Sequence, residues 1–222
     1  MESNDTWLKE YCEREGLDVF GVGKMAVYEK ELVGIDDSVK DRFPFAISFG
    51  LVLSKGVIGT VKNGPNVLYL HHYRQANYRL DMVAYLLSKE IEKRGYQAMP
   101  FPASQLVDWR NQKGHISHKR VGEITGVGWI GRNNLLIHPL FGARARYNTV
   151  LTDMPLTAHE PLRAGCGECR ACISVCPAGA IKDDRSEFDH IGCFNMITQL
   201  KNKRNLGHHI CGICIAVCQG EE

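Results

Sequence analysis

Eight cysteines that follow residue 165 have the spacing of ligands for iron–sulfur clusters. Four of them lie in the segment CGECRACISVCPAGAI, residues 166–181, separated by two, two and three residues, with proline after the fourth. In proteins with two 4Fe-4S clusters, three thiolates of such a run hold one cluster and the fourth binds the other. The spacing therefore predicts a protein that transfers electrons.

The remaining four of these cysteines form a second set whose first member is displaced. The segment CGICIAVC, residues 211–218, keeps the spacings of two and three, and 17 residues separate Cys193 from Cys211. Four ligands are thus available for each of two clusters. The crossing rule assigns Cys166, Cys169, Cys172 and Cys218 to one cluster, and Cys176, Cys193, Cys211 and Cys214 to the other. Cys12 is left over.

Two other chemistries use several cysteines, namely zinc binding and disulfide formation. Zinc sites usually separate their cysteine pairs by a longer loop. A chain with nine cysteines and neither a signal peptide nor a long apolar run is expected in the reducing cytoplasm, where disulfides are rare. Two clusters use all eight ligands, so we favour iron–sulfur chemistry.

The composition predicts a compact protein of one larger and one smaller domain. The chain has 222 residues, of which 44% are hydrophobic and 23% charged, with a net charge of +2 that gives no general attraction to nucleic acid or membranes. The polar stretch MPLTAHEPLRAG, residues 154–165, precedes the cysteine-rich part. We therefore expect an α/β domain in residues 1–160 and a two-cluster domain in residues 161–222.

The pattern ahead of the cysteines alternates strands and helices, which is typical of an α/β sandwich. The first helix is expected to begin with Asn4 or Asp5 as its cap, to bury Cys12 and to end at Gly16. Expected helices cover residues 4–16, 66–94 and 117–125, and expected strands cover residues 17–23, 43–53, 96–102, 134–139 and 146–153. The strand in 43–53 is apolar enough to lie centrally in a sheet.

The segment GVGWIG, residues 126–131, contains three glycines, at 126, 128 and 131. Glycines free the backbone to approach a bulky ligand, and Trp129 offers a flat apolar surface. A tight turn between a helix and a strand would require glycines equally well. The residues alone leave both interpretations open.

The longer segment GVGWIGRNNLLIHPLFGARARYNTVLTD, residues 126–153, resembles the hallmark of epoxyqueuosine reductases, which depend on cobalamin and are related to reductive dehalogenases. The family usually has lysine where Arg132 stands, and the hallmark leads into the same cysteine run. The resemblance extends from Val121 to Cys218. It implies a nitroreductase-like α/β domain that holds cobalamin beside a two-cluster ferredoxin-like module. The corrinoid contacts it implies are Gly126, Val127, Gly128, Trp129, Ile130, Gly131, Arg132, Asn133 and Asn134.

The same resemblance implies a reaction and its partners. In the family, two 4Fe-4S clusters reduce cobalt to Co(I), which acts on the epoxide of a modified tRNA nucleoside. An external donor of the ferredoxin or flavodoxin type would supply electrons, in the cytoplasm and away from membranes. Two alternatives stay open: an electron-transfer protein that reduces a cofactor on a partner, and an enzyme of the dehalogenase type.

Two departures from the family concern the substrate. The family's catalytic aspartate lies fourteen residues before the first glycine of the hallmark, a position that Gln112 occupies here. We therefore expect the proton donor among Asp108, His115 and His118, although each could instead stabilise a turn or a helix. The chain also ends four residues after Cys218, where the family continues into a helical-repeat domain that helps to hold tRNA. The basic residues left for nucleic acid are Arg144, Arg146, Lys201, Lys203, Arg204, His208 and His209.

Overall fold

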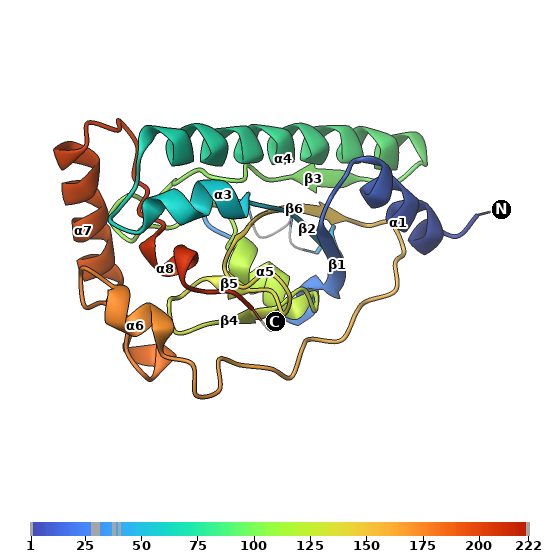
Figure 1. Cartoon of the computed structure of the whole chain (residues 1–222). Helices are drawn as coiled ribbons and strands as arrows, with labels where there is room; N and C mark the ends of the chain where they lie inside the picture. The colour runs from blue at the N-terminus through green and yellow to red at the C-terminus, as the bar shows by residue number, and fades with distance from the viewer. Residues whose placement is uncertain (1, 28–31, 37–38, 40, 221–222) are drawn as a thin grey trace. The chain divides into compact units, whose positions relative to one another are not determined.

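The computed structural model (Figure 1) describes residues 2–27, 32–36, 39 and 41–220, and its fold is a mixed α/β one, as predicted. The main sheet has four strands in the order β1-β2-β6-β3, and β4 and β5 form a separate pair. The strands are β1 (Val19–Lys24), β2 (Phe45–Val52), β3 (Ala98–Pro100), β4 (Trp129–Ile130), β5 (Leu136–Ile137) and β6 (Ala145–Thr152). The α-helices are α1 (Asn4–Arg14), α3 (Lys55–Ile58), α4 (Val67–Lys93), α5 (His118–Ile124), α6 (Ala171–Val175), α7 (His190–Lys203) and α8 (Ile213–Ala216). Short 3-10 helices cover Met25–Val27, Gly59–Val61 and Arg185–Glu187.

Helix α1 buries the apolar stripe that its sequence predicts. Its buried side chains are Trp7, Leu8, Tyr11 and Cys12. The cap is Ser3, whose hydroxyl accepts a hydrogen bond from the backbone N–H of Thr6, so the expectation of Asn4 or Asp5 was wrong by one or two residues. Burial raises the pKa of the Cys12 thiol to about 12, and this ninth cysteine is a core residue, as predicted.

Helix α4 is the longest element, and its length and buried face agree with the sequence pattern. Leu80, Val83, Leu87 and Ile91 recur every three or four residues and are fully buried, because that spacing returns to one face of a helix. They join the same core as Ile47 of β2. Gly95 follows the helix with a φ of +87°, the left-handed conformation that commonly ends helices.

The sheet is built from antiparallel pairs around a buried centre. Strand β1 pairs with β2 so that Phe20 lies opposite Phe49, and β3 pairs with β6 so that Met99 lies opposite Leu151. Strand β2 has neighbours on both sides and buries residues 46–50, which confirms the expected central strand.

The chain divides into two compact units that differ from the two consecutive domains expected from sequence. The first unit consists of 1–51, 77–128 and 146–162, and the second of 52–76, 129–145 and 163–222. The cysteine-rich part thus begins near the expected boundary, but it shares a unit with two earlier segments. The reason is packing, because Leu206 and Ile210 share a core with residues of the 52–76 segment.

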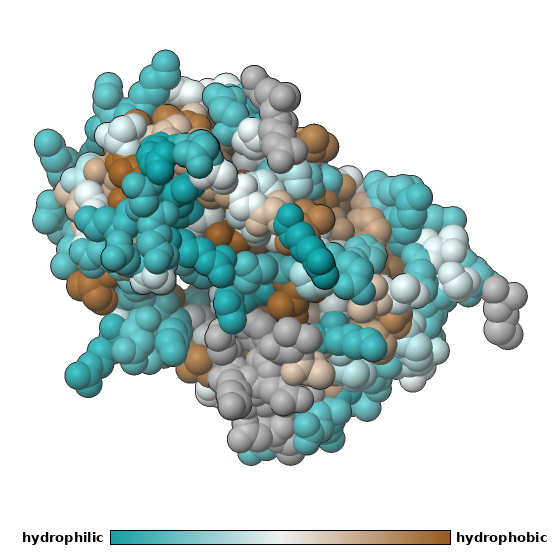
Figure 2. Space-filling view, turned by 90° about the horizontal axis from the view of Figure 1, so that it is seen from below, coloured by the Kyte–Doolittle hydropathy of each residue, from teal (hydrophilic) through white to brown (hydrophobic). Residues whose placement is uncertain are grey.

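None of the helices in the described part of the chain has the length and apolar composition needed to cross a bilayer. In the coloured part of the face in Figure 2, hydrophobic residues lie in separate patches among hydrophilic ones.

Candidate functional site

The first set of thiols, Cys166, Cys169, Cys172 and Cys218, lies together in the second unit. A turn brings Cys169 to Cys166, with the Cys169 N–H donating to the Cys166 carbonyl at 3.0 Å, and Cys172 follows on α6. Burial raises the pKa of Cys172 to about 11, and the charges of Cys218, Cys166 and Cys169 also act to raise it. Cys218, 46 residues further along the chain than Cys172, is therefore within electrostatic reach of the first motif.

The second set gathers around α7 and α8. The pKa of Cys193 is raised to about 11. Burial is the largest cause, and the nearby charges of Cys211 and Cys176 raise it further. The pKa of Cys214 is also raised, first by burial and then by Cys211, Cys193, Cys172 and Cys176, in that order. Cys176 thus interacts with the second set, although it belongs to the first motif in sequence. Because Cys172 also affects Cys214, the two sets adjoin each other.

The burial of these thiols favours binding of a cation, because thiolates without a bound cation would be costly in this environment. Burial makes an isolated thiolate costly, and iron would offset that cost with positive charge. Within the described residues, no three His, Cys, Asp or Glu side chains converge as they would on a single metal ion. A 4Fe-4S cluster needs no such convergence, since each of its four thiolates binds a different iron.

The turn at 138–142 supports Cys218. Sequence reasoning did not predict this role for the turn. The His138 N–H donates to the Gly142 carbonyl and the Gly142 N–H to the His138 carbonyl. Burial raises the pKa of Cys218, while the backbone N–H groups of Ala143 and Gly220 donate to its sulfur and oppose the rise. The segment HPLFGARA therefore supports the fourth ligand of the first set, and its glycine was the only signal in the sequence.

Two of the three glycines in the predicted corrinoid segment are required by packing within the chain. Gly126 has a φ of +72°, and a Cβ there would stand 2.5 Å from the Glu160 carbonyl oxygen. A Cβ on Gly131 would stand 2.7 Å from Ile137. For these two positions, the tight-turn interpretation explains the glycines better than an approach to a ligand.

Three buried donors in the second unit have no hydrogen-bond partner among the described residues. They are the Trp129 indole N–H, the Asn133 amide nitrogen and Nε of Arg144. Buried donors normally have acceptors, so a ligand that carries carbonyl or phosphate oxygens would satisfy them. A corrinoid with amide side chains and a nucleotide phosphate is such a ligand. Trp129 and Asn133 are among the nine residues expected from the resemblance, and their contact with a corrinoid stays a prediction.

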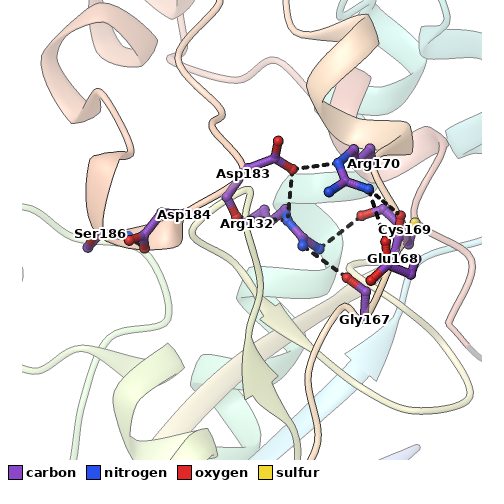
Figure 3. Close-up of polar contacts among 8 residues, drawn as sticks. All are labelled: Arg132, Gly167, Glu168, Cys169, Arg170, Asp183, Asp184 and Ser186. Atoms are coloured by element: carbon purple, nitrogen blue, oxygen red, sulfur yellow. Dashed lines mark hydrogen bonds and ion pairs between the residues drawn. The ribbon is translucent and has the colours of Figure 1, made fainter.

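Arg132 contacts the cysteine loop instead (Figure 3). Its Nη2 donates to the Gly167 carbonyl at 2.9 Å, its Nη1 to the Cys169 carbonyl at 3.0 Å, and its Nε to the Asp183 carbonyl at 2.9 Å. These contacts use all three guanidinium nitrogens. They replace the corrinoid contact expected for Arg132 with a contact to the chain's own ligand loop.

Two of the three expected proton donors have evident structural tasks or contacts, and Asp108 is the first. Its carboxylate accepts from the Asn111 N–H at 3.0 Å and from the Asn111 side-chain amide at 2.7 Å. These hydrogen bonds hold its pKa below the usual value. Asp108 therefore stays ionised and stabilises a turn, which is the alternative that the sequence left open.

His118 is half-buried between a strand and a loop. Its Nε2 lies 2.9 Å from the Pro102 carbonyl and its Nδ1 lies 2.9 Å from the Thr149 hydroxyl. A carbonyl only accepts, so Nε2 carries the proton and Nδ1 accepts from Thr149. Burial lowers the pKa of His118 to about 4. This arrangement favours a structural role over the proton donation expected from sequence.

His115 keeps one ring nitrogen for chemistry. Its Nδ1 donates to the Val33 carbonyl at 2.8 Å, which leaves Nε2 as the ring nitrogen that is not engaged by this carbonyl. His115 is therefore the member of the expected trio whose contacts are most compatible with proton transfer.

Most of the basic residues expected to face nucleic acid have contacts inside the protein. Arg144 is buried, and Arg146 donates to Asn77 at 3.0 Å. Arg204 donates to the Asn63 carbonyl, while His208 contacts Tyr73 and His209 stacks on Phe194. Lys201 and Lys203, in the last turn of α7, are what the structure leaves for a basic surface here.

The fold is one that known reductases share. A catabolic reductive dehalogenase, NpRdhA, superposes over 95% of this chain and 31% of its own with a TM-score of 0.74 at 18% identity. An epoxyqueuosine reductase crystallised with a tRNA stem loop superposes over 96% of this chain and 64% of its own, with a TM-score of 0.61 at 19% identity. Both likenesses concern the fold.

Sequence similarity points to one of these two groups. The epoxyqueuosine reductase of Bacillus anthracis is 32% identical over 113 residues, which are 47% of this chain and 30% of that protein. The enzyme of Staphylococcus aureus is 27% identical over 148 residues, or 63% of this chain and 36% of that protein. The chain thus spans about a third of the length of these relatives. No family model matches the sequence. The resemblance to epoxyqueuosine reductases expected from the motifs is confirmed.

Proposed function

We propose that the chain is an iron–sulfur oxidoreductase of the epoxyqueuosine reductase type, with two 4Fe-4S clusters and a cobalamin. The observation that carries this proposal is that Cys166 and Cys218, far apart in sequence, pack against the same apolar cluster, while Cys176 lies within electrostatic reach of Cys193. This grouping supports the crossed wiring of a two-cluster module. The nitroreductase-like domain of the proposal corresponds to the part of the chain with the four-stranded sheet.

The chain's own residues would divide the work as follows. The first cluster would be bound by Cys166, Cys169, Cys172 and Cys218, and the second by Cys176, Cys193, Cys211 and Cys214. Trp129, Asn133 and Arg144 would donate hydrogen bonds to a bound cobalamin. When bound, cobalamin supplies a strongly reducing cobalt centre. His115 would supply a proton to the departing oxygen of the substrate through Nε2.

The substrate we propose is the epoxide of a modified nucleoside in tRNA, and a ferredoxin or flavodoxin is the proposed electron donor. The similarity to named epoxyqueuosine reductases supports this substrate. The test supplies the anaerobically purified chain with iron, sulfide and cobalamin, and measures both bound cofactors and conversion of epoxyqueuosine in tRNA. A chain that loads both cofactors and forms queuosine meets the expectation.

A second function is favoured by one specific observation. Two of the three expected proton donors, Asp108 and His118, have structural hydrogen bonds. An electron-transfer protein that reduces a cofactor on a partner needs no proton donor of its own. Loaded clusters without bound cobalamin and without turnover would favour this function over the first, and turnover of a halogenated aromatic alone would favour a dehalogenase-type enzyme.

A further inference from the structure

Arg132 reaches three backbone carbonyls that belong to two segments remote from it in sequence. The acceptors are the carbonyls of Gly167, Cys169 and Asp183, all at 2.9 to 3.0 Å. The Arg132 side chain is only 16% exposed, although the residues that supply the three carbonyls lie at the surface. Three acceptors in different directions match the rigid planar fork of a guanidinium, and a lysine ammonium could not reach them all.

The segment that carries Arg132 is itself well fixed. The Gly131 N–H donates to the Leu135 carbonyl, and the Asn134 N–H donates to the Gly131 carbonyl, which closes the β4-β5 turn. Arg185 donates in the opposite direction, from its Nη1 to the Ile130 carbonyl at 3.2 Å. The turn and the segment around Asp183 are therefore joined from both sides.

Besides Arg132, the loop is held by the Cys169 N–H, which donates to the Cys166 carbonyl at 3.0 Å, and by Nη1 of Arg170, which reaches the Glu168 carbonyl at a longer 3.4 Å. Gly167 adopts a φ of +48°, and Cys169 is exposed. Glycine loses much conformational entropy when it is ordered, so a loop built on Gly167 needs external contacts to keep one geometry. Arg132 binds the carbonyls on either side of Glu168, between the ligands Cys166 and Cys172.

Charge adds to this geometry. Asp183 accepts from Nε of Arg170 at 2.6 Å and lies 3.8 Å from Nε of Arg132, and Arg170 also pairs with Glu168 at 3.3 Å (Figure 3). Two arginines thus face two carboxylates. Removing Arg132 would leave one excess negative charge beside the loop, and negative charge disfavours the reduced form of a cluster.

We propose that Arg132 is a positioning residue for the first cluster, which fixes the 167–169 loop and raises the cluster's reduction potential. This inference rests on the proposed function, because it assumes that Cys166, Cys169, Cys172 and Cys218 bind a cluster. Arg132 does not touch the reacting atoms. It acts through the loop that carries the ligands.

The test uses the full chain with both clusters reconstituted anaerobically and compares Arg132→Lys and Arg132→Gln with the parent. The matched control is Arg170→Gln, which removes the same charge beside the same loop, together with one long 3.4 Å bond to the Glu168 carbonyl, from a half-exposed side chain. The readouts are the rate of iron loss to a chelator and the midpoint potential from a redox titration followed by EPR.

In both Arg132 variants, about half of the iron should be lost roughly tenfold faster than from the parent, and the other half at the parent's rate. A tenfold effect is what the loss of about one strong hydrogen bond would give. The potential of the first cluster should fall in Arg132→Gln and less in Arg132→Lys, whereas Arg170→Gln should lose iron like the parent. If Arg132→Gln does not fold, Arg132→Lys decides. A loaded parent whose Arg132 variants lose iron no faster than the Arg170 control overturns this inference alone. A parent that takes up no iron overturns the proposed function with it.

Discussion

Gly142 packs directly against the backbone carbonyl of Cys218, and a Cβ at this glycine would overlap the carbonyl oxygen. The φ of Gly142 is +58°, a backbone conformation that residues with a Cβ rarely adopt. A turn far from Cys218 in sequence thus fixes the cysteine expected to complete the first cluster.

Gly142→Ala should therefore remove the first cluster, because the chain around Cys218 must shift to make room. Iron should fall from about eight to about four atoms per chain. The matched control is Gly207→Ala, since Gly207 has a φ of +64° and a Cβ there would meet no described atom within 4 Å. Both variants carry a similar backbone strain of about 1 kcal/mol, so full iron content in Gly142→Ala would contradict the role of this contact.

The crossed arrangement of the cysteines predicts which variants share a defect. Cys176→Ser should lose the same cluster signal as Cys193→Ser, and Cys172→Ser should lose the other, as EPR and Mössbauer spectra would reveal. Cys12→Ala provides a control with full iron content, because Cys12 is a core residue. An intact second cluster in Cys176→Ser would rule out the crossing.

His118 predicts a specific dependence of stability on pH. Its pKa is about 4 when folded and about 6.5 when unfolded, so the unfolded chain binds the extra proton between these values. The free energy of unfolding should therefore decrease as pH falls from about 6.5 to 4, by up to about 3 kcal/mol.

His118→Gln is the variant to compare, since glutamine can donate to the Pro102 carbonyl and accept from Thr149 without titrating. Denaturant unfolding at a series of pH values measures the difference. Below about pH 6.5 the parent should lose stability relative to the variant, and two parallel profiles would show that His118 titrates alike in both states.

His115 and Asp108 should respond differently in the reductase assay. His115→Gln should slow turnover roughly tenfold, equal to about 1.4 kcal/mol of transition-state stabilisation, because it removes the imidazole that would donate from Nε2 when both ring nitrogens carry a proton. Asp108→Asn keeps an acceptor for the Asn111 N–H and should turn over like the parent. Equal rates in all three proteins would place proton delivery elsewhere or favour the electron-transfer function. Bound cobalamin should be unchanged throughout.

The sequence predicted what depends on short-range spacing. Apolar periodicity predicted three features of the fold, because apolar residues that recur with the period of a helix or strand lie on its buried face. These features are the stripe of α1, the buried face of α4 and the central strand β2. The assignment of the eight cysteines to two clusters rests on ligand spacing and stays a prediction.

Contacts between distant segments carry no periodic signal, and these were missed. The grip of Arg132 on the 167–169 loop, the support of Cys218 by Gly142 and the inclusion of 52–76 with the cysteines all depend on tertiary packing. The same holds for His118. Its role depends on its surroundings in the fold, and the polar segment that contains it gives no signal of those surroundings.

The discontinuous second unit has a consequence for biogenesis. Synthesis proceeds from the N-terminus, so Leu53, Tyr69 and Leu70 emerge long before Leu206 and Ile210, with which they share a core. During translation this apolar surface has no permanent partner and is a natural target for chaperones. In the proposed assignment, insertion of the first cluster must wait as well, because Cys218 is its last ligand in the chain, and the second must wait for Cys214. Cluster delivery would thus come late, and a chain stalled before Cys218 would expose both an unfinished core and reactive thiols to oxygen.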